Sequence, residues 1–365
     1  MSYQDVPADL LSRLSHRLRD QLYSMITIPD PPNPMEPSLQ SRASSLGTLD
    51  RLPVELLYEV LMSLDFQSSI SFSRASIQGK NIVCSLPAYR DVMKHAPHAL
   101  AALSRTKLLH FHSASDLHNA LRNERCATCP EYGVYLFLPT CERCCWQCLR
   151  SKPTRRVVSP TAATKTFALS PKMVRQLPVM FSIPGTYGVA CKPTQKSYRL
   201  VSVTAAKELA MSIYGSPGDA IEAIIRRRPP NERTESTARS LRAIFSDFAC
   251  LDSLMVPDQG NTGVDRYFGM ASIPFPSLTT PDILEHGLWC KGCEWTFNQH
   301  RGRRIPAYVI ANMVPADCDP DRVLLGMVRR AYSSVRLSAH IQHCYGAQQL
   351  LASQMCKKVE RVPSP

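Results

Sequence analysis

The feature that most constrains this chain is a dense run of cysteines. Six of its 14 cysteines lie between Cys126 and Cys148, as three Cys-x2-Cys pairs: 126/129, 141/144 and 145/148. Two such pairs supply the four thiolates of a tetrahedral zinc site. Cys126 and Cys129 form the first pair, but the second stays open here, because 141/144 and 145/148 have the same spacing. The alternating run 134–138 predicts a β-hairpin that brings the pairs together.

No secretion signal is expected at the start of the chain. Its first ten residues lack the apolar core of a signal peptide, and no apolar run approaches the roughly 18 residues needed to span a bilayer. These features predict an intracellular protein, in the cytoplasm or the nucleus, without a membrane partner. In such a reducing compartment, paired cysteines indicate a metal site more often than a disulfide.

A second metal module is predicted near the C-terminus. Cys290 and Cys293 form another Cys-x2-Cys pair, with no cysteine pair nearby to complete it. Downstream, His340 and Cys344 stand four residues apart, so a helix would place both on one face. The predicted ligands are Cys290, Cys293, His340 and Cys344, with His300 and His343 as competing ligands. The two modules together predict two zinc ions per chain.

The spacing of these modules argues against two familiar zinc domains. The long separation within the second module differs from the roughly 12-residue spacing of DNA-reading fingers. A RING finger needs more metal ligands than the six cysteines of the first module, and no histidine occurs between His118 and His286 to add to them. Neither DNA reading by a finger nor direct recruitment of a ubiquitin-conjugating enzyme is therefore predicted.

The chain is basic, with 43 Lys and Arg against 30 Asp and Glu and a net charge of +13. Such a charge favours nucleic acid or another acidic partner. The basic residues form short clusters beside proline or glycine, without interleaved aromatic residues for base stacking. These clusters are Arg150, Lys152, Arg155 and Arg156; Arg226, Arg227 and Arg228; and Arg301, Arg303 and Arg304. The pattern indicates solvated loops, so a nucleic-acid partner is not expected, and a zinc-dependent nucleic-acid-binding protein remains the alternative function.

Residues 53–64 predict an amphipathic helix with a wide apolar face. Pro53 suits the first turn of a helix, and the carboxylate of Glu55 complements the helix dipole. Its apolar side chains cover an arc of roughly 160°, more than the ~100° stripe of a surface helix. The helix is therefore expected to pack on its own module and also on a second surface. This surface belongs either to the rest of this chain or to a partner.

A resemblance to a known family covers this helix. The run Leu52-Pro53-x-Glu55-Leu56-Leu57-x-x-Val60-Leu61-x-x-Leu64-Asp65, followed by Ile70, Phe72, Arg74 and Ala75, resembles the F-box signature. In that family three short helices dock on a Skp-type adaptor, which links them to a cullin scaffold. The resemblance implies that the adaptor contacts are made by Leu52, Pro53, Leu56, Leu57, Val60 and Ile70. Gly79 interrupts the expected third helix.

The first cysteine module resembles the zinc-ribbon-like segment that follows the F-box in many fungal F-box proteins. That pattern reads CxxC…LFLPTCxRxCxxCL. It matches Cys126, Cys129, Cys141, Cys145 and Cys148. The resemblance therefore favours Cys145 and Cys148 as the second pair, with Cys141 as the alternate, and leaves Cys144 as an addition. The ligand set of the second module recurs in the same family.

The predicted fold is α+β, with a small three-helix F-box followed by a mixed α+β domain stabilised by zinc. Residues 1–45 are expected to be a flexible segment with an amphipathic helix, and residues 46–105 the F-box. The zinc-ribbon-like module follows at 106–150, a mixed α+β domain with the second zinc site at 151–352, and a tail at 353–365. A linker is expected at about 151–164, and helices at 204–214 and 236–248.

The expected function is that of a substrate receptor in a Skp–cullin–F-box ubiquitin ligase. One end of the chain would bind the Skp-type adaptor, and through it a cullin, while the other end holds a protein substrate whose identity the residues do not specify. Catalysis would belong to the partners. No GxSxG, HExxH or GxxxxGK motif occurs, and the cysteines are explained in pairs, so the chain is not expected to be an enzyme.

Overall fold

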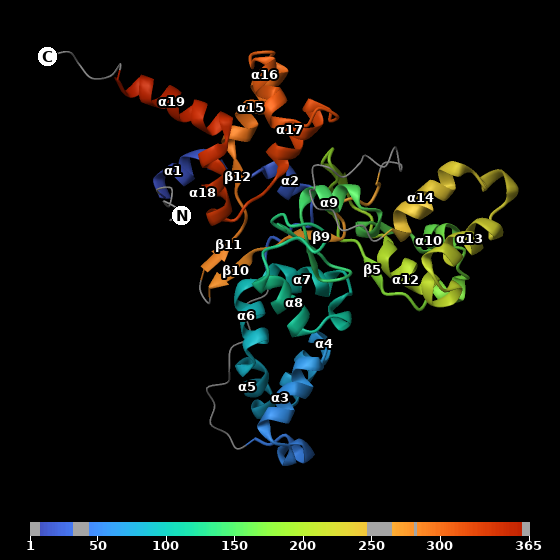
Figure 1. The fold of residues 1–365 in the computed structure, drawn as a ribbon. Helices are drawn as coiled ribbons and strands as arrows, with labels where there is room; N and C mark the ends of the chain where they lie inside the picture. The colour runs from blue at the N-terminus through green and yellow to red at the C-terminus, as the bar shows by residue number, and fades with distance from the viewer. Residues whose placement is uncertain (1–7, 32–43, 247–264, 281–282, 360–365) are drawn as a thin grey trace.

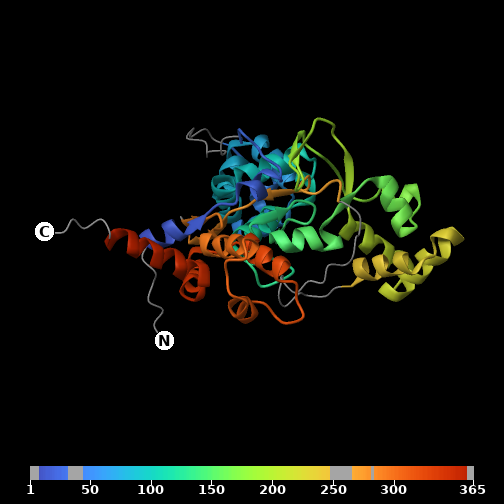
Figure 2. The same ribbon diagram turned by 90° about the horizontal axis from the view of Figure 1, so that it is seen from above.

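Short helices and small sheets make up the computed structural model, which describes residues 8–31, 44–246, 265–280 and 283–359 (Figure 1, Figure 2). The α+β class predicted from the sequence is confirmed. One large apolar cluster runs from Met25 and Ile26 through the helices of residues 54–105 to the strand residues Ile273 and Leu278. The boundary predicted at residue 105 therefore divides one continuous core.

The sequence predicts three helices in residues 46–105, whereas consecutive short helices fill residues 47–122. Asp65 caps the N-terminus of one by accepting from the Ser68 amide at 2.9 Å, and Ser76 caps the next through the Gly79 amide at 2.9 Å. Prolines occupy the first turn of two others. The helices are η1 (Gly47–Arg51), α3 (Val54–Ser63), α4 (Phe66–Ala75), α5 (Ile77–Ser85), α6 (Pro87–His95), α7 (Pro97–Arg105), η2 (Leu109–Phe111) and α8 (Ala114–Arg122).

The interruption expected at Gly79 is wrong. Helix α5 runs through this residue and ends before Pro87, which begins α6. A Cβ at Gly79 would lie 2.9 Å from the carbonyl oxygen of Phe72, so the glycine permits α5 to pack closely on α4.

A three-stranded antiparallel sheet with the order β3-β2-β9 crosses the main core. Its central strand β2 (Tyr135–Phe137) pairs with β3 (Glu142–Cys144) and with β9 (Ser272–Pro274). Leu136 faces Arg143 on one side and Ile273 on the other. The hairpin predicted for residues 134–138 is confirmed, and the third strand comes from a distant part of the chain.

A second apolar core, which includes Phe167, Val201, Ile224 and Phe245, lies in residues 157–245 (Figure 1). Helices cover a small sheet here, and α12 and α14 confirm the predicted helices as far as residue 245, while residues 247–248 lie outside the described residues. The elements are β4 (Val157–Val158), α10 (Pro160–Phe167), α11 (Pro171–Val174), β5 (Val179–Phe181), β6 (Gly185–Tyr187), β7 (Lys192–Thr194), β8 (Arg199–Ser202), α12 (Val203–Tyr214), α13 (Pro217–Arg227), η4 (Pro230–Glu232) and α14 (Glu235–Phe245).

The linker expected at 151–164 is wrong. Helix α9 (Trp146–Ser151), η3 (Pro153–Arg155), β4 and most of α10 occupy these residues. The side chain of Arg155 forms an ion pair with Glu142 and lies over the ring of Phe137, so it is not in a solvated loop. Arg228 likewise donates to the carbonyl oxygen of Thr166 at 3.0 Å. The third basic cluster, of Arg301, Arg303 and Arg304, is exposed as expected.

The N-terminal segment, predicted to be flexible, is packed into the fold over residues 8–31. It forms α1 (Ala8–Leu14), β1 (Ser15–His16) and α2 (Arg19–Tyr23). Leu14, Met25 and Ile26 are each 1% exposed. The segment therefore contributes to the core, because its leucines, isoleucines and methionine have apolar neighbours to cover them. Residues 1–7 and 32–43 of the predicted segment lie outside the described residues.

The C-terminal part is mainly helical and carries the second predicted metal module. Its elements are β10 (Ser277–Thr280), β11 (Ile283–Glu285), β12 (Trp289–Cys290), α15 (Lys291–Arg301), α16 (Ala307–Met313), α17 (Pro320–Arg329), α18 (Ser334–His343) and α19 (Tyr345–Val359). The tail predicted from residue 353 begins inside α19, and residues 360–365 lie outside the described residues. Across the described ranges, every helix is too short or too polar to cross a membrane.

Candidate metal centres

The first cysteine module brings four sulfur atoms to one point. The Sγ atoms of Cys126, Cys129, Cys145 and Cys148 all lie within 4.8 Å of one another, and those of Cys129 and Cys145 are 3.6 Å apart. Zn–S bonds of 2.3 Å at tetrahedral angles give sulfur–sulfur edges of about 3.8 Å, whereas a disulfide bond needs about 2.05 Å. The four buried cysteines are therefore unbonded thiols with the spacing of ligands to one ion.

In each pair, a backbone amide donates to the sulfur atom of the first cysteine. The amide of Thr128 donates to Cys126 Sγ at 3.4 Å, and the amide of Cys148 donates to Cys145 Sγ at 3.4 Å. Cys145 is the N-cap of α9, so Cys148 lies in the first turn of that helix. The β2–β3 hairpin joins the two pairs, because β3 ends directly before Cys145.

The electrostatics of this group favour a bound cation. Hydrogen bonds from Cys129, and further ones from Cys144, Cys145 and Cys148, hold the pKa of Cys126 well below its usual value. The same contacts with Cys126 raise the pKa values of Cys145 and Cys148 well above the usual range. One thiolate thus opposes ionisation of its neighbours, and a divalent ion would stabilise all four thiolates together while releasing their protons.

The two remaining cysteines of the cluster stand outside the group of four. Cys141 occupies the turn between β2 and β3 with φ +50°, and its Sγ lies 3.9 Å from the carbonyl oxygen of Leu138. Cys144 is the last residue of β3 and lies beside Cys126, whose pKa it affects, without joining the four. The structure therefore selects 145/148 as the second pair, and leaves the alternate Cys141 aside.

Arg143, between Cys141 and Cys144, binds the backbone of the segments around this module. The spacing of the cysteines did not predict this role. Its side chain is 2% exposed, and its guanidinium donates to the carbonyl oxygens of Gly133 at 2.8 Å and Ala120 at 3.2 Å. Further bonds reach Pro276 at 2.8 Å and Phe275 at 3.0 Å. The signal that could have indicated it is an arginine between two cysteines of the predicted zinc module, because a buried charge needs several acceptors.

The second module also gathers its four predicted ligands. The ligand atoms of Cys290, Cys293, His340 and Cys344 all lie within 4.8 Å of one another. Cys344 Sγ is 3.7 Å from Cys290 Sγ and 4.0 Å from Cys293 Sγ. Cys293 Sγ is 3.2 Å from His340 Nε2. These sulfur–sulfur distances bracket the tetrahedral edge of about 3.8 Å.

The route by which His340 and Cys344 meet differs from the prediction. His340 lies in the last turn of α18, but Cys344 is the residue after that helix, with φ −79° and ψ 112°. The two side chains converge because the chain turns at Cys344 from α18 into α19. The other two ligands of this module lie at the junction of β12 and α15, where Cys290 precedes the helix and Cys293 is in its first turn.

The imidazole of His340 is held by its surroundings. The ring of Tyr332 stacks on it, with centroids 4.8 Å apart and 21° between the planes. Burial lowers the pKa of His340, but contacts with Cys290 and Cys344 outweigh it and raise this pKa to about 9. A hydrogen bond between the side chains of Cys290 and Cys344 lowers the pKa of Cys344. The negative charge of the thiolates therefore attracts a proton to His340, and a metal ion can take its place.

The competing histidines do not enter this group. His343 is exposed on α18. His300, in the last turn of α15, has its Nε2 atom 3.5 Å from the Asp321 carboxylate. The named four are the set that the fold assembles.

Gly292, inside the Cys290–Cys293 turn, allows two helices to meet at the site. A Cβ at this position would lie 2.3 Å from the backbone nitrogen of Ala347 and 2.7 Å from its Cα. Such contacts are too close for real atoms, so α15 can approach the start of α19 only with glycine here.

The N-terminal strand completes the second module from far away in the sequence. Strand β1 pairs antiparallel with β12, with Ser15 opposite Cys290 and His16 opposite Trp289. Lys291 Nζ donates to the carbonyl oxygen of Arg13 at 2.8 Å. Leu14 packs in the same apolar cluster as the three cysteine ligands. The sequence did not predict this pairing, although an amphipathic helix, as predicted within residues 1–45, has an apolar face that another element must cover.

The residues predicted to contact an adaptor divide between surface and interior. Leu52 and Pro53, before α3, and Leu56 and Val60, on α3, are exposed, and Ile70 on α4 is partly buried. Leu57 is 4% exposed and belongs to the main core, so its prediction as a surface contact is wrong. It lies on the inner face of α3 together with Leu61, since one helical step of about 100° separates it from Leu56.

Comparison with known proteins adds no assignment. No family model matches the chain, and no curated protein or solved structure matches it.

Proposed function

We propose that this protein is the substrate receptor of a Skp–cullin–F-box ubiquitin ligase. In this proposal α3 docks on a Skp-type adaptor, and the rest of the chain holds a protein substrate. The observation that carries the proposal is a set of exposed apolar side chains at one end of the molecule. Leu52, Val54, Leu56 and Val60 are 38%, 50%, 49% and 50% exposed, and three of them belong to α3.

The two faces of α3 have different surroundings, which supports docking. Leu57 and Leu61 are buried in the main core, so the helix is anchored without its outer face. Covering apolar surface is favourable by about 25 cal/mol per Å². A partner that covered the outer face would therefore gain affinity without unpacking α3. In Figure 1, α3 lies at the opposite end of the molecule from α15, α18 and α19, so docking there leaves the second metal module free.

We further propose that both metal centres hold zinc as a structural ion. Four cysteines, or three cysteines and a histidine, form donor sets that suit zinc, and they would fill all four positions of a tetrahedron. A catalytic zinc keeps one position open for water or substrate. Closed sites fit a receptor whose chemistry is done by its partners, and such ions contribute directly to folding.

The test is binding of a purified Skp-type adaptor to the zinc-loaded full chain and to a Leu56→Glu/Val60→Glu variant. Charges on an apolar interface remove anchor contacts that commonly contribute about 2 kcal/mol or more, so affinity should fall at least roughly thirtyfold. Both side chains are about half exposed, and the variant should therefore keep its zinc content and its unfolding temperature.

Val189→Glu is the matched control, because Val189 is equally exposed but lies in the β6–β7 hairpin turn. Its adaptor affinity should stay within about twofold of the wild type, as for surface changes in general. Wild-type protein that fails to bind the adaptor, or a double variant that binds equally well, would contradict the proposal. Absence of adaptor binding together with steeply salt-dependent retention on DNA or RNA would favour the nucleic-acid alternative instead.

A further inference from the structure

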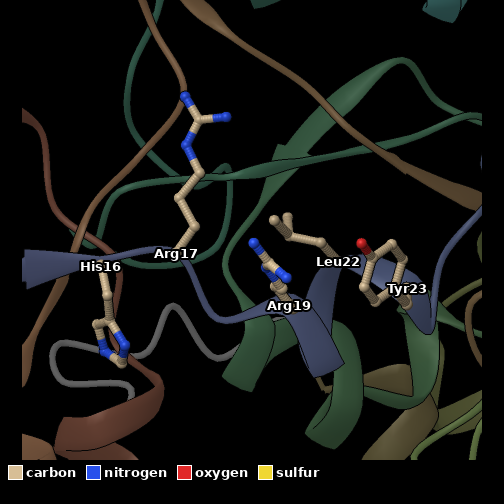
Figure 3. A pocket seen from close by; sticks show the side chains of 5 residues that line it. All are labelled: His16, Arg17, Arg19, Leu22 and Tyr23. Carbon is tan, nitrogen blue, oxygen red and sulfur yellow. The ribbon is translucent and has the colours of Figure 1, made fainter.

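A pocket formed by the N-terminal segment contains no ligand of either metal centre and no residue of the α3 surface. It has a volume of about 490 Å³ and is lined by His16, Arg17, Arg19, Leu22 and Tyr23 (Figure 3). This volume lies within the roughly 300–1,000 Å³ typical of small-molecule sites. In Figure 1 the segment that carries it, around α2, lies well away from α3.

Among the described residues that line the pocket, two are arginines and none carries a carboxylate. Arg17 and Arg19 are exposed, and within the described part of the chain neither guanidinium has a hydrogen bond or an ion pair. This differs from other arginines of the protein, such as Arg155 and Arg228, whose side chains bind acceptors of the fold. The two guanidinium groups are therefore available to a ligand.

The backbone under the two arginines is held on both sides. Before them, β1 pairs with β12, and His16 Nδ1 lies 3.5 Å from the Glu294 carboxylate. After them, Gln21 is buried and accepts from the Tyr135 hydroxyl at 3.3 Å. A ligand would thus need to order only side chains, which keeps the entropic cost of binding low.

We propose that this pocket binds a phosphate monoester, with Arg17 and Arg19 on the phosphate and Leu22 and Tyr23 against the organic group. A guanidinium offers a planar pair of donors that matches phosphate oxygens. A phosphate monoester carries about −1.5 to −2 charges at pH 7, which two arginines balance better than they balance a single carboxylate. The pocket is larger than a phosphate group, and the side chains of Leu22 and Tyr23 would contact the organic group that occupies the remaining space.

The same chemistry can come from a phosphorylated protein side chain or from a small phosphorylated metabolite. The experiment uses the zinc-loaded full chain and isothermal titration calorimetry with phenyl phosphate and with a short peptide carrying one phosphoserine. Benzoate and the unphosphorylated peptide are the matched ligands. At least one phosphate monoester should bind with one-to-one stoichiometry and at least tenfold tighter than its matched ligand. Tighter binding of the peptide identifies a protein ligand, and tighter binding of phenyl phosphate a small molecule.

The variant Arg17→Gln/Arg19→Gln should weaken that binding at least tenfold, while zinc content and unfolding temperature stay unchanged, because both side chains are exposed. The control Arg13→Gln/Arg51→Gln removes the same charge outside the pocket and should change the affinity less than twofold. Failure of both phosphate monoesters to bind the wild type would overturn the proposal. An equal loss in the control variant would also overturn it, since binding would then follow net charge and not this pocket.

Discussion

The guanidinium of Arg143 donates to backbone carbonyl oxygens of Ala120, Gly133, Phe275 and Pro276, and so joins three separate segments. Burial lowers the pKa of Arg143, but its ordinary value is high enough that the charge remains. Arg143→Met would leave these carbonyl groups without their donors. Because each buried unsatisfied group costs about 1–3 kcal/mol, the free energy of unfolding should fall by about 3 kcal/mol or more in urea titrations.

Arg122→Met is the control for that change, because Arg122 is an exposed arginine at the end of α8. An exposed substitution of this kind is expected to alter stability by no more than about 0.5 kcal/mol. If Arg143→Met behaves like this control, Arg143 does not hold the first module together.

A second prediction at the residue scale concerns Gly292. Gly292→Ala places a Cβ against the backbone of Ala347, so α15 and α19 must move apart. Overpacking of this kind costs about 1–3 kcal/mol, and here the movement would also separate Cys290 and Cys293 from Cys344. The variant should lose its second metal ion to a chelator well before its first, as followed by zinc release over time.

Gly302→Ala, at the other end of α15, is the comparison. The nearest atom to its added Cβ lies at 3.5 Å, an ordinary contact, so this variant should release zinc at the wild-type rate. Identical release from the Gly292 and Gly302 variants would mean that close approach of the helices is not required at the site.

At the scale of elements, strand β1 is expected to be part of the second metal centre although it supplies no ligand. Deleting residues 1–16 removes the partner of β12 and uncovers the apolar cluster around Leu14. Loss of one buried leucine alone costs about 1.5–3 kcal/mol. The shortened protein should bind one zinc ion tightly and the other weakly in competition with a chelator. Retention of both ions with wild-type affinity would show that β1 only covers the module.

How far the sequence could predict these elements depends on the distance over which their residues interact. The cysteine turns, the β2–β3 hairpin and helix α3 are set by residues a few positions apart, so spacing and periodicity indicate them. The pairing of β1 with β12 joins two-residue strands from opposite ends of the chain, and strands this short carry no periodic signal. The linker predicted at 151–164 is wrong for a related reason, since Arg155 is fixed by a carboxylate from the preceding hairpin.

At the scale of the whole molecule, the spacing of cysteines and histidines predicts the four ligands of the second module. In the first module, the choice of the second pair also needs the resemblance to a family pattern. Spacing alone leaves two pairs open in the first module, and the convergence of four sulfur atoms decides between them. Helix α3 is a second example of what periodicity leaves open. The apolar arc is wider than the face that a helix packs on its own module, but periodicity does not say which side chains, such as Leu57, lie in the core. One continuous core links α3 to the β2–β3 hairpin, which leads directly into Cys145 of the first metal centre, so folding and metal binding are expected to be coupled.

Two groups of side chains in this chain could each hold a metal ion, and we propose that both hold zinc, one bound by four cysteines and one by three cysteines and His340. X-ray absorption at the zinc edge tests this most directly on protein made in zinc-containing medium, together with elemental analysis. The account predicts two equivalents of zinc, seven sulfur ligands at about 2.3 Å and one nitrogen ligand at about 2.0–2.1 Å shared between them. His340→Cys should convert this signal to sulfur alone. A single equivalent of zinc, or a first coordination sphere rich in oxygen and nitrogen, would contradict it.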